Sequence, residues 1–185
     1  MKNFSHLAAA ATLAALALAG AAAQATPVVV DVSGAQSVNL QGEAGNTVWL
    51  VNVGANALVN ALDWSVTLNA FSPSSLSEMQ VSFGNSGGLD LLTIAPGLLD
   101  TMSGSGSYSG TLDLSGYGIA AGADGLLRIE FSEAYKDLAV GTAEGQWTAG
   151  TLTFDVSAVP EPASVTLALV GLGLVGTQLR RRQAR

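Results

Sequence analysis

The stretch Leu62-Asp63-Trp64-Ser65-Val66-Thr67-Leu68-Asn69 alternates apolar and polar side chains at every step. Successive side chains of a strand point to opposite faces of a sheet, so this alternation predicts a half-buried β-strand with its apolar face inward. The same alternation recurs in residues 108–114, 127–131 and 151–156. Residues 47–53 are apolar on both faces and predict a central strand, and we expect further strands near 28–32, 79–83 and 89–94.

Glycine-rich turn signals separate these segments. They lie at 84–88, 95–97, 103–107 and 123–125, and we interpret the Ser/Gly run 103–107 as a flexible hairpin loop. Short alternating strands with turns at near-regular spacing indicate an all-β fold. The sequence therefore predicts an antiparallel β-sandwich of jelly-roll-like type.

The composition of residues 26–158 excludes several kinds of chemistry. The chain has no cysteine, and its one histidine, His6, lies in an N-terminal segment that we expect to be removed. Ser-His-Asp and Cys-His catalysis and His-ligated or Cys-ligated metal sites therefore have no residues in this part of the chain. Thirteen acidic residues stand against two basic ones, Arg128 and Lys136, which gives a net charge of −11 and argues against nucleic-acid binding.

Carboxylates are the remaining candidates for chemistry. Glu130 with Glu133, or Asp63 with another strand residue, could form a glycosidase pair. The favoured interpretation is that Asp63, Asp113, Glu130 and Asp155 are solvated side chains on the polar faces of strands, so we do not expect an enzyme. We expect no cofactor, since no EF-hand loop or repeated Gly-Asp motif is present. Calcium is the alternative, because acidic Gly-rich loops supply oxygen ligands, and its first candidate ligands are Asp90, Asp100 and Asp124.

Tryptophans offer one hypothesis of ligand binding, because exposed aromatic rings stack on sugars. Trp49 and Trp64 share strand faces with apolar neighbours, so we expect them in the core. Trp147 precedes an alternating strand and is the candidate ligand contact if it is exposed; the alternative is a packed corner of the sandwich.

The N-terminal segment has the pattern of a secretory signal peptide. Lys2 supplies the positive charge, residues 7–19 are rich in Ala and Leu, and Ala23 and Ala25 supply the small side chains before a cleavage site. We therefore expect a signal peptide at 1–25, cleaved by signal peptidase, and a mature protein that begins at Thr26 and has its ectodomain at 26–158.

The C-terminal segment combines three features at 159–185. A proline-rich break comes first, formed by Val159, Pro160, Glu161, Pro162, Ala163 and Ser164. Residues 163–179 then carry no charge and, as a helix, would span roughly 25 Å, nearly the thickness of a bilayer core. Arg180, Arg181 and Arg182 form a basic stop, which predicts a membrane helix with its end in the cytoplasm.

This tail resembles the PEP-CTERM sorting signal of Gram-negative bacteria, on the Val-Pro-Glu-Pro-Ala-Ser motif at 159–164, the apolar helix and the arginine cluster. The resemblance implies that an exosortase, a membrane protease, recognises the tail of a precursor held in the inner membrane and passes the protein outward. A plain tail anchor with a proline hinge is the alternative.

These features together predict an exported, non-enzymatic protein of the cell envelope or of an extracellular biofilm matrix. We expect the mature form in the outer envelope or outside the cell. The alternative function is a secreted carbohydrate-binding module with the same sorting tail and an exopolysaccharide as its partner.

Overall fold

The computed structural model describes residues 25–157, and this part of the chain contains strands and loops only. The expected membrane helix at 163–179, the sorting motif and most of the signal peptide lie outside these residues. Within 25–157 no helix is long and apolar enough to cross a membrane. The strands are β1 (Ala25–Asp31), β2 (Gln36–Ser37), β3 (Thr47–Asn52), β4 (Leu58–Ala70), β5 (Met79–Asn85), β6 (Leu91–Ile94), β7 (Gly104–Asp113), β8 (Leu126–Glu133) and β9 (Gly145–Ser157).

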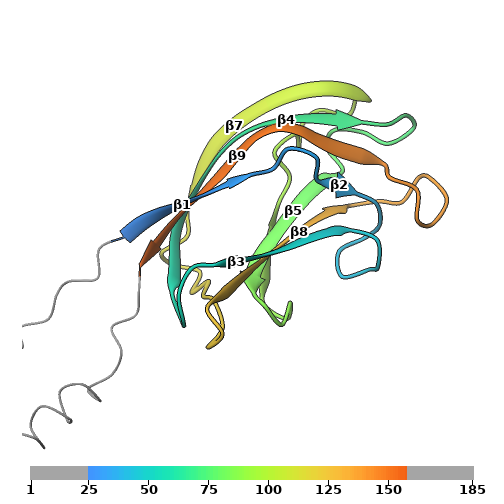
Figure 1. Cartoon of the computed structure of the whole chain (residues 1–185). Helices are drawn as coiled ribbons and strands as arrows, with labels where there is room; N and C mark the ends of the chain where they lie inside the picture. Colours follow the sequence, from blue (N-terminus) through green and yellow to red (C-terminus); the bar gives the residue numbers. More distant parts are fainter. Residues whose placement is uncertain (1–24, 158–185) are drawn as a thin grey trace, which may run out of the picture. The chain divides into compact units, whose positions relative to one another are not determined.

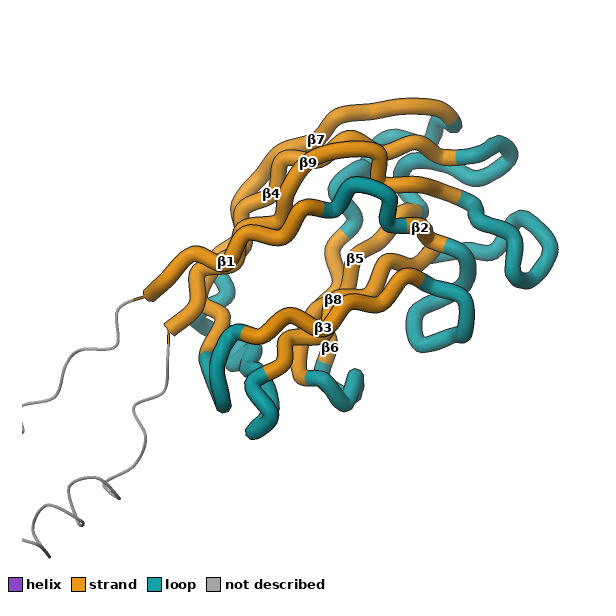
Figure 2. The backbone as a smooth tube through the Cα atoms, in the orientation of Figure 1, coloured by secondary structure: helices purple, strands orange, loops and turns teal. Residues whose placement is uncertain are grey.

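The strands form two antiparallel sheets that face each other (Figures 1 and 2). One sheet has the order β1-β9-β4-β7, with the short β2 also paired to β9, and the other has the order β3-β8-β5-β6. Each strand predicted from alternation is present, and the predicted β-sandwich is confirmed. A strand of a sandwich buries only one of its two faces, which is why these strands show apolar residues at every second position.

The core lies between the two sheets and is rich in aromatic rings. The ring of Phe131 packs edge-on against Trp49 and Trp147, with centroids 4.9 and 5.0 Å away, and Phe83 meets Phe154 at 5.2 Å. Phe83 and Phe131 belong to one sheet, Trp147 and Phe154 to the other, so the contacts of Phe131 with Trp147 and of Phe83 with Phe154 join the two layers. Such edge-to-face pairs add to the stabilisation from burial alone.

Two predictions about individual strands are wrong. β3 is an edge strand and not a central one, since it pairs only with β8, and its outward-facing Val48 and Leu50 are exposed. The Ser/Gly run 103–107 is not a loop, because β7 begins at Gly104 and pairs with β4 without interruption as far as Asp113. The predicted turns at 95–97 and 123–125 are confirmed, whereas Gly84 and Asn85 still belong to β5.

β9 carries a bulge that changes which of its side chains face the core. Across from β4, Thr67 pairs with Ala149 but Leu68 pairs with Trp147, so Thr148 is left over. Gly150 beside it has φ +109°, and a Cβ there would overlap the carbonyl oxygen of Ser65. The bulge therefore requires glycine at this position.

Both ends of the described chain lie together. Ala25 pairs with Ser157, the last residue of β9, and Leu58 at the start of β4 pairs with the same residue (Figure 1). The turn after β5 and the connection from β7 to β8 lie at this end of the sandwich, which we call the terminal end. The connections from β6 to β7 and from β8 to β9 lie at the opposite, distal end.

Candidate functional site

A hollow of about 470 Å³ opens at the terminal end of the sandwich. It lies between the turn after β5 and the connection from β7 to β8, and we call it the Tyr117 hollow. Its lining consists of Asn85, Ser86, Asp90, Tyr117, Gly118, Ile119, Ala120, Ala121 and Gly122. The connection is held in place by backbone hydrogen bonds, among them Val59 N to Ile119 O at 2.9 Å and Ala121 N to Ala57 O at 2.9 Å.

Polar side chains on the turn side of the hollow are fixed by hydrogen bonds. The Asn85 amide donates to Asp90 Oδ2 at 3.4 Å, and the Ser86 hydroxyl donates to Asp124 Oδ2 at 2.6 Å. The Ser86 hydroxyl and the amide of Leu126 lower the pKa of Asp124, so this exposed carboxylate stays ionised. Tyr117 is 60 % exposed, so its ring is available to a ligand.

The hollow brings together two of the three aspartates predicted as calcium ligands. Asp90 lines it and Asp124 is bonded to its wall, whereas Asp100 lies at the distal end, where it accepts a hydrogen bond from Tyr108 at 2.7 Å. Among residues 25–157, no group of three acidic or histidine side chains is placed to hold a metal ion. Chemically, the hollow offers a ring face, an amide, a hydroxyl and carboxylate acceptors without a basic side chain.

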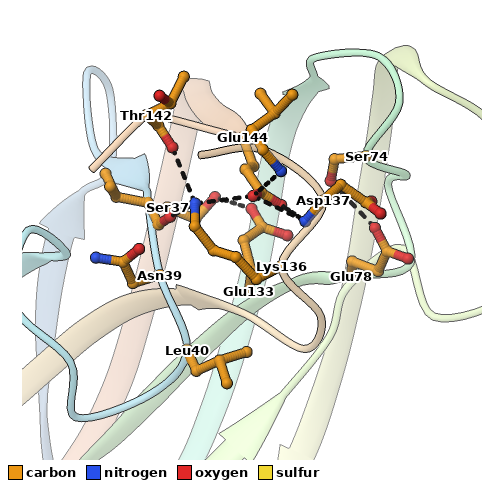
Figure 3. Close-up of polar contacts among 12 residues, drawn as sticks. Ser37, Asn39, Leu40, Ser74, Glu78, Glu133, Lys136, Asp137, Thr142 and Glu144 are labelled. Carbon is orange, nitrogen blue, oxygen red and sulfur yellow. Dashed lines mark hydrogen bonds and ion pairs between the residues drawn. The ribbon is translucent and has the colours of Figure 1, made fainter. Parts of the chain in front are cut away.

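A second group of polar residues lies buried at the distal end, and Figure 3 shows it in detail. The Glu144 carboxylate is fully buried and accepts hydrogen bonds from Lys136 Nζ at 2.8 Å and from the amides of Asp137 and Leu138. Burial alone would raise the pKa of Glu144, but Lys136 and these amides outweigh it and lower that pKa. Glu144 thus holds the connection from β8 to β9 in place.

Glu133 belongs to the same buried group but has a different environment. Its Oε1 accepts a hydrogen bond from the Ser37 hydroxyl, and its Oε2 has no partner. Burial, with the nearby charges of Glu144 and Glu78, raises the pKa of Glu133 to about 7. With a pKa of about 7, the carboxyl can change its protonation state near neutral pH. Because Glu133 is only 1 % exposed, the carboxyl cannot meet a large substrate.

The candidate glycosidase pair is not assembled. Glu130 and Glu133 are three residues apart on β8, so their side chains point to opposite faces of the sheet. The interpretation of Glu130 as a solvated side chain is also wrong, since it is fully buried and bonded to Arg128 Nη2 at 2.8 Å, Gly42 N at 2.7 Å and Asn46 Nδ2 at 3.0 Å. Burial raises its pKa, but these three donors lower it by more. Asp63 and Asp113 are exposed, as expected, and Asp155 is half-buried.

The tryptophans all belong to the core region. Trp49 and Trp64 are half-buried and pack against the core, as predicted. Trp147 is fully buried, so the hypothesis that it is an exposed ligand contact is wrong. The alternative, that Trp147 packs into a corner of the sandwich, describes its position. The exposed aromatic residue that lines a hollow with polar groups at the terminal end is Tyr117, which the sequence reasoning missed. Its position between Gly116 and Gly118, outside any alternating segment, was the available signal.

Most residues of the predicted processing sites lie outside the described range. These are Ala23 of the signal peptide, Val159, Pro160, Glu161, Pro162, Ala163 and Ser164 of the motif, and Arg180, Arg181 and Arg182 of the basic stop. Ala25 is described: it is exposed and begins β1.

Residues 158–182 match a family model described as the PEP-CTERM protein-sorting motif. The C-terminal tail is a PEP-CTERM sorting signal. This confirms the resemblance noted on residues 159–185. A PEP-CTERM tail implies export through a membrane-anchored precursor and processing by an exosortase-type protease.

Comparisons of the whole chain gave only distant similarities. No curated protein sequence matches the chain. Among solved structures it is similar to part of the complex of an Aeromonas sobria serine protease with its chaperone (11% identity, 80% of this chain and 29% of that one, TM-score 0.43). It is also similar to the infectious bursal disease virus VP2 subviral particle (11% identity, 72% of this chain and 32% of that one, TM-score 0.34). A third similar structure is that of tomato aspermy virus (15% identity, 89% of this chain and 98% of that one, TM-score 0.32). The similarity thus spans less than a third of the first two chains.

Proposed function

We propose that this chain is an exported, non-enzymatic protein of the cell envelope or extracellular matrix, delivered by exosortase-type processing of its PEP-CTERM tail. The match at residues 158–182 carries the proposal. The acidic composition of the sandwich supports it, because a net charge of −11 keeps an exported protein soluble. The precursor would be held in the inner membrane of a Gram-negative cell by residues 163–179, with Arg180 to Arg182 in the cytoplasm, and the mature form would reach a biofilm matrix or the outer envelope.

We further propose that the sandwich is a jelly-roll. From β2 onward every connection crosses from one sheet to the other, except the hairpin from β5 to β6. Two four-stranded layers linked in this way fit the eight-stranded, two-sheet jelly-roll, with β2 as an additional short strand.

The tail is tested by a variant that removes the motif and keeps the helix. With Pro160→Ala, Glu161→Ala and Pro162→Ala together, the precursor should accumulate at full length in the inner membrane, because insertion depends on residues 163–179 and the arginines. Intact mass and membrane fractionation in a host that has the protease measure this. Thr177→Ala with Gln178→Ala is the matched control and should be processed normally. A triple variant with the same size and location as the wild type would count against recognition of the motif and would instead support a plain tail anchor.

The Tyr117 hollow favours a second candidate function, carbohydrate binding, at a site other than Trp147. Its ring face, amide and carboxylates suit a neutral, polyhydroxylated ligand, since sugars stack on aromatic rings and bond to such groups. Anionic sugars fit less well, because Asp90 and Asp124 would repel them.

A panel of neutral oligosaccharides on a glycan array tests this with the exported protein. Tyr117→Ala should weaken binding at least tenfold, about 1.4 kcal/mol. Tyr135→Ala is the matched control, since Tyr135 is 63 % exposed but lies at the distal end, and it should bind as the wild type does. Equal binding by both variants, or no binding by the wild type, would count against the hollow as a sugar site.

A further inference from the structure

β7 forms one edge of the five-stranded sheet and leaves its outer side open. Its ten residues pair with β4 from Gly104 to Asp113 without a register shift. No other described strand lies beyond β7, and its residues make no backbone hydrogen bond in turns or loops. Every second residue of an edge strand directs its amide and carbonyl away from the sheet, so a row of unpaired groups faces outward here.

This edge lacks the features by which proteins usually protect edge strands. Typical protection is a short strand, a proline, a charge or a bulge. β7 is long for a strand, has no proline, and residues 101–112 contain no charge. Two of the other edges differ: β1 contains Pro27, which has no amide hydrogen, and β6 has only four residues. The edge strand β3 also has no proline or charge, but its six residues offer a shorter row of unpaired groups than the ten of β7.

Exposed apolar side chains adjoin the same edge. A hollow of about 660 Å³ is lined by residues 96–102 and by Tyr108 of β7. Leu98, Leu99 and Met102 in this loop are 66 %, 96 % and 69 % exposed. Neighbouring apolar residues that are exposed to this degree mark interaction surfaces.

We propose that β7 pairs with β7 of a second copy of this chain, antiparallel about a two-fold axis, so that two sheets join into one. A strand set against itself in this way meets its own hydrogen-bonding pattern. Each residue before the two-fold axis pairs with the residue equally far after it in the partner strand, and a residue on the axis pairs with its own symmetry mate. A second copy is the occupant that this edge fits, because the strand is complementary to itself in hydrogen bonding and the segment 101–112 is uncharged on both copies. Two domains of charge −11 repel each other over most of their surfaces, and the uncharged segment 101–112 lets them approach. The small side chains of the outward-facing Ser105, Ser107 and Ser109 leave room for a partner strand.

Single cysteines test this pairing directly, since the natural chain has none. Ser105→Cys, Ser107→Cys and Ser109→Cys are made separately, and the exported, processed proteins are oxidised singly and in pairwise mixtures. Paired residues of antiparallel strands lie about 4.5–5.5 Å apart between Cα atoms, within reach of a disulfide. Ser65→Cys is the matched control, because Ser65 is exposed on the same sheet face but lies on β4, one strand away from the edge.

At least one of the β7 cysteines or their mixtures should give a disulfide-linked dimer on a non-reducing gel, and Ser65→Cys should not. Sedimentation equilibrium should show a wild-type dimer that Ser107→Lys with Ser109→Lys weakens at least tenfold, while the circular dichroism spectrum is unchanged. No cross-link at any β7 position, a cross-link to a different protein, or a wild-type protein that remains monomeric at high concentration would each overturn the proposal.

Discussion

The protonation of Glu133 links the buried distal group to pH. Burial and two neighbouring carboxylates, Glu144 and Glu78, raise its pKa from 4.5 to about 7, and Lys136 and the Ser37 hydroxyl offset only part of this. The folded protein therefore binds a proton at this site more tightly than the unfolded chain does. Stability from this group is fully present below pH 4.5 and is lost as the pH rises from there to about 7.

Glu133→Gln should remove this pH dependence. The amide keeps an oxygen for the Ser37 hydroxyl and carries no charge, so the variant should be more stable than the wild type at pH 8, by roughly 3 kcal/mol from the shift in pKa. At pH 4 the two should be nearly equal. Urea unfolding at several pH values measures this, with Asp63→Asn, an exposed carboxylate, as the control. A wild type whose stability rises between pH 5 and pH 7 relative to Glu133→Gln would contradict it.

Strand alternation could place Leu62, Val66 and Leu152 in the core from the sequence, but it could not place Trp147 or Glu130. Counting back from Leu152 by twos puts Trp147 on the outer face, and only the bulge at Thr148 returns its side chain to the core. Glu130 does lie on the outer face of its sheet, but Gly42 and Asn46 come from a distant loop that covers it. Both outcomes depend on tertiary structure that alternation does not encode.

At the scale of the strand, β7 shows why a Ser/Gly run can be extended and not a loop. Gly110 pairs with Trp64, whose indole lies over it, and Gly106 lies under the ring of Tyr108. Glycine here makes room for aromatic rings on the inner face, whereas the serines face outward. From the sequence, the glycines predicted flexibility. The contacts with the two aromatic rings, which require glycine at these positions, could not be predicted.

Gly110→Ala should therefore destabilise the sandwich by about 1–3 kcal/mol, since the added Cβ would overlap the Trp64 indole. Thermal or urea unfolding measures the change, and the tryptophan emission should shift as the ring moves. Gly116→Ala is the control: it lies in a loop with no atom near the added Cβ, and its effect should stay within about 0.5 kcal/mol. Equal stability of the two variants would show that the ring does not need glycine beneath it.

The prediction that β3 is a central strand is wrong for a related reason. An apolar pattern on both faces predicts burial on both faces, yet Val48 and Leu50 are exposed at a sheet edge. Which strand becomes an edge is decided by the order in which strands pair, and no local pattern contains that order.

For the whole molecule, export should leave a first residue close to the start of β1. Cleavage after Ala25 would give a mature chain that begins at Thr26, which pairs with Val156, so six of the seven pairs between β1 and β9 remain. Intact mass of the exported protein should match this start. Ala23→Glu with Ala25→Glu should retain the signal peptide, since large charged side chains do not suit signal peptidase, and Ala25 is exposed, so the fold tolerates the change. A wild-type mass that includes Lys2 would contradict the assignment.

The pairing of β9 also decides how the protein responds to force. The sorting tail follows β9, whose last residue is Ser157. β9 lies between β1 and β4 and is hydrogen-bonded to both along most of its 13 residues. Antiparallel hydrogen bonds run perpendicular to the strand, so tension along β9 loads the bonds of both ladders together and does not open them one at a time. A sandwich held by its C-terminal segment would thus resist mechanical extraction.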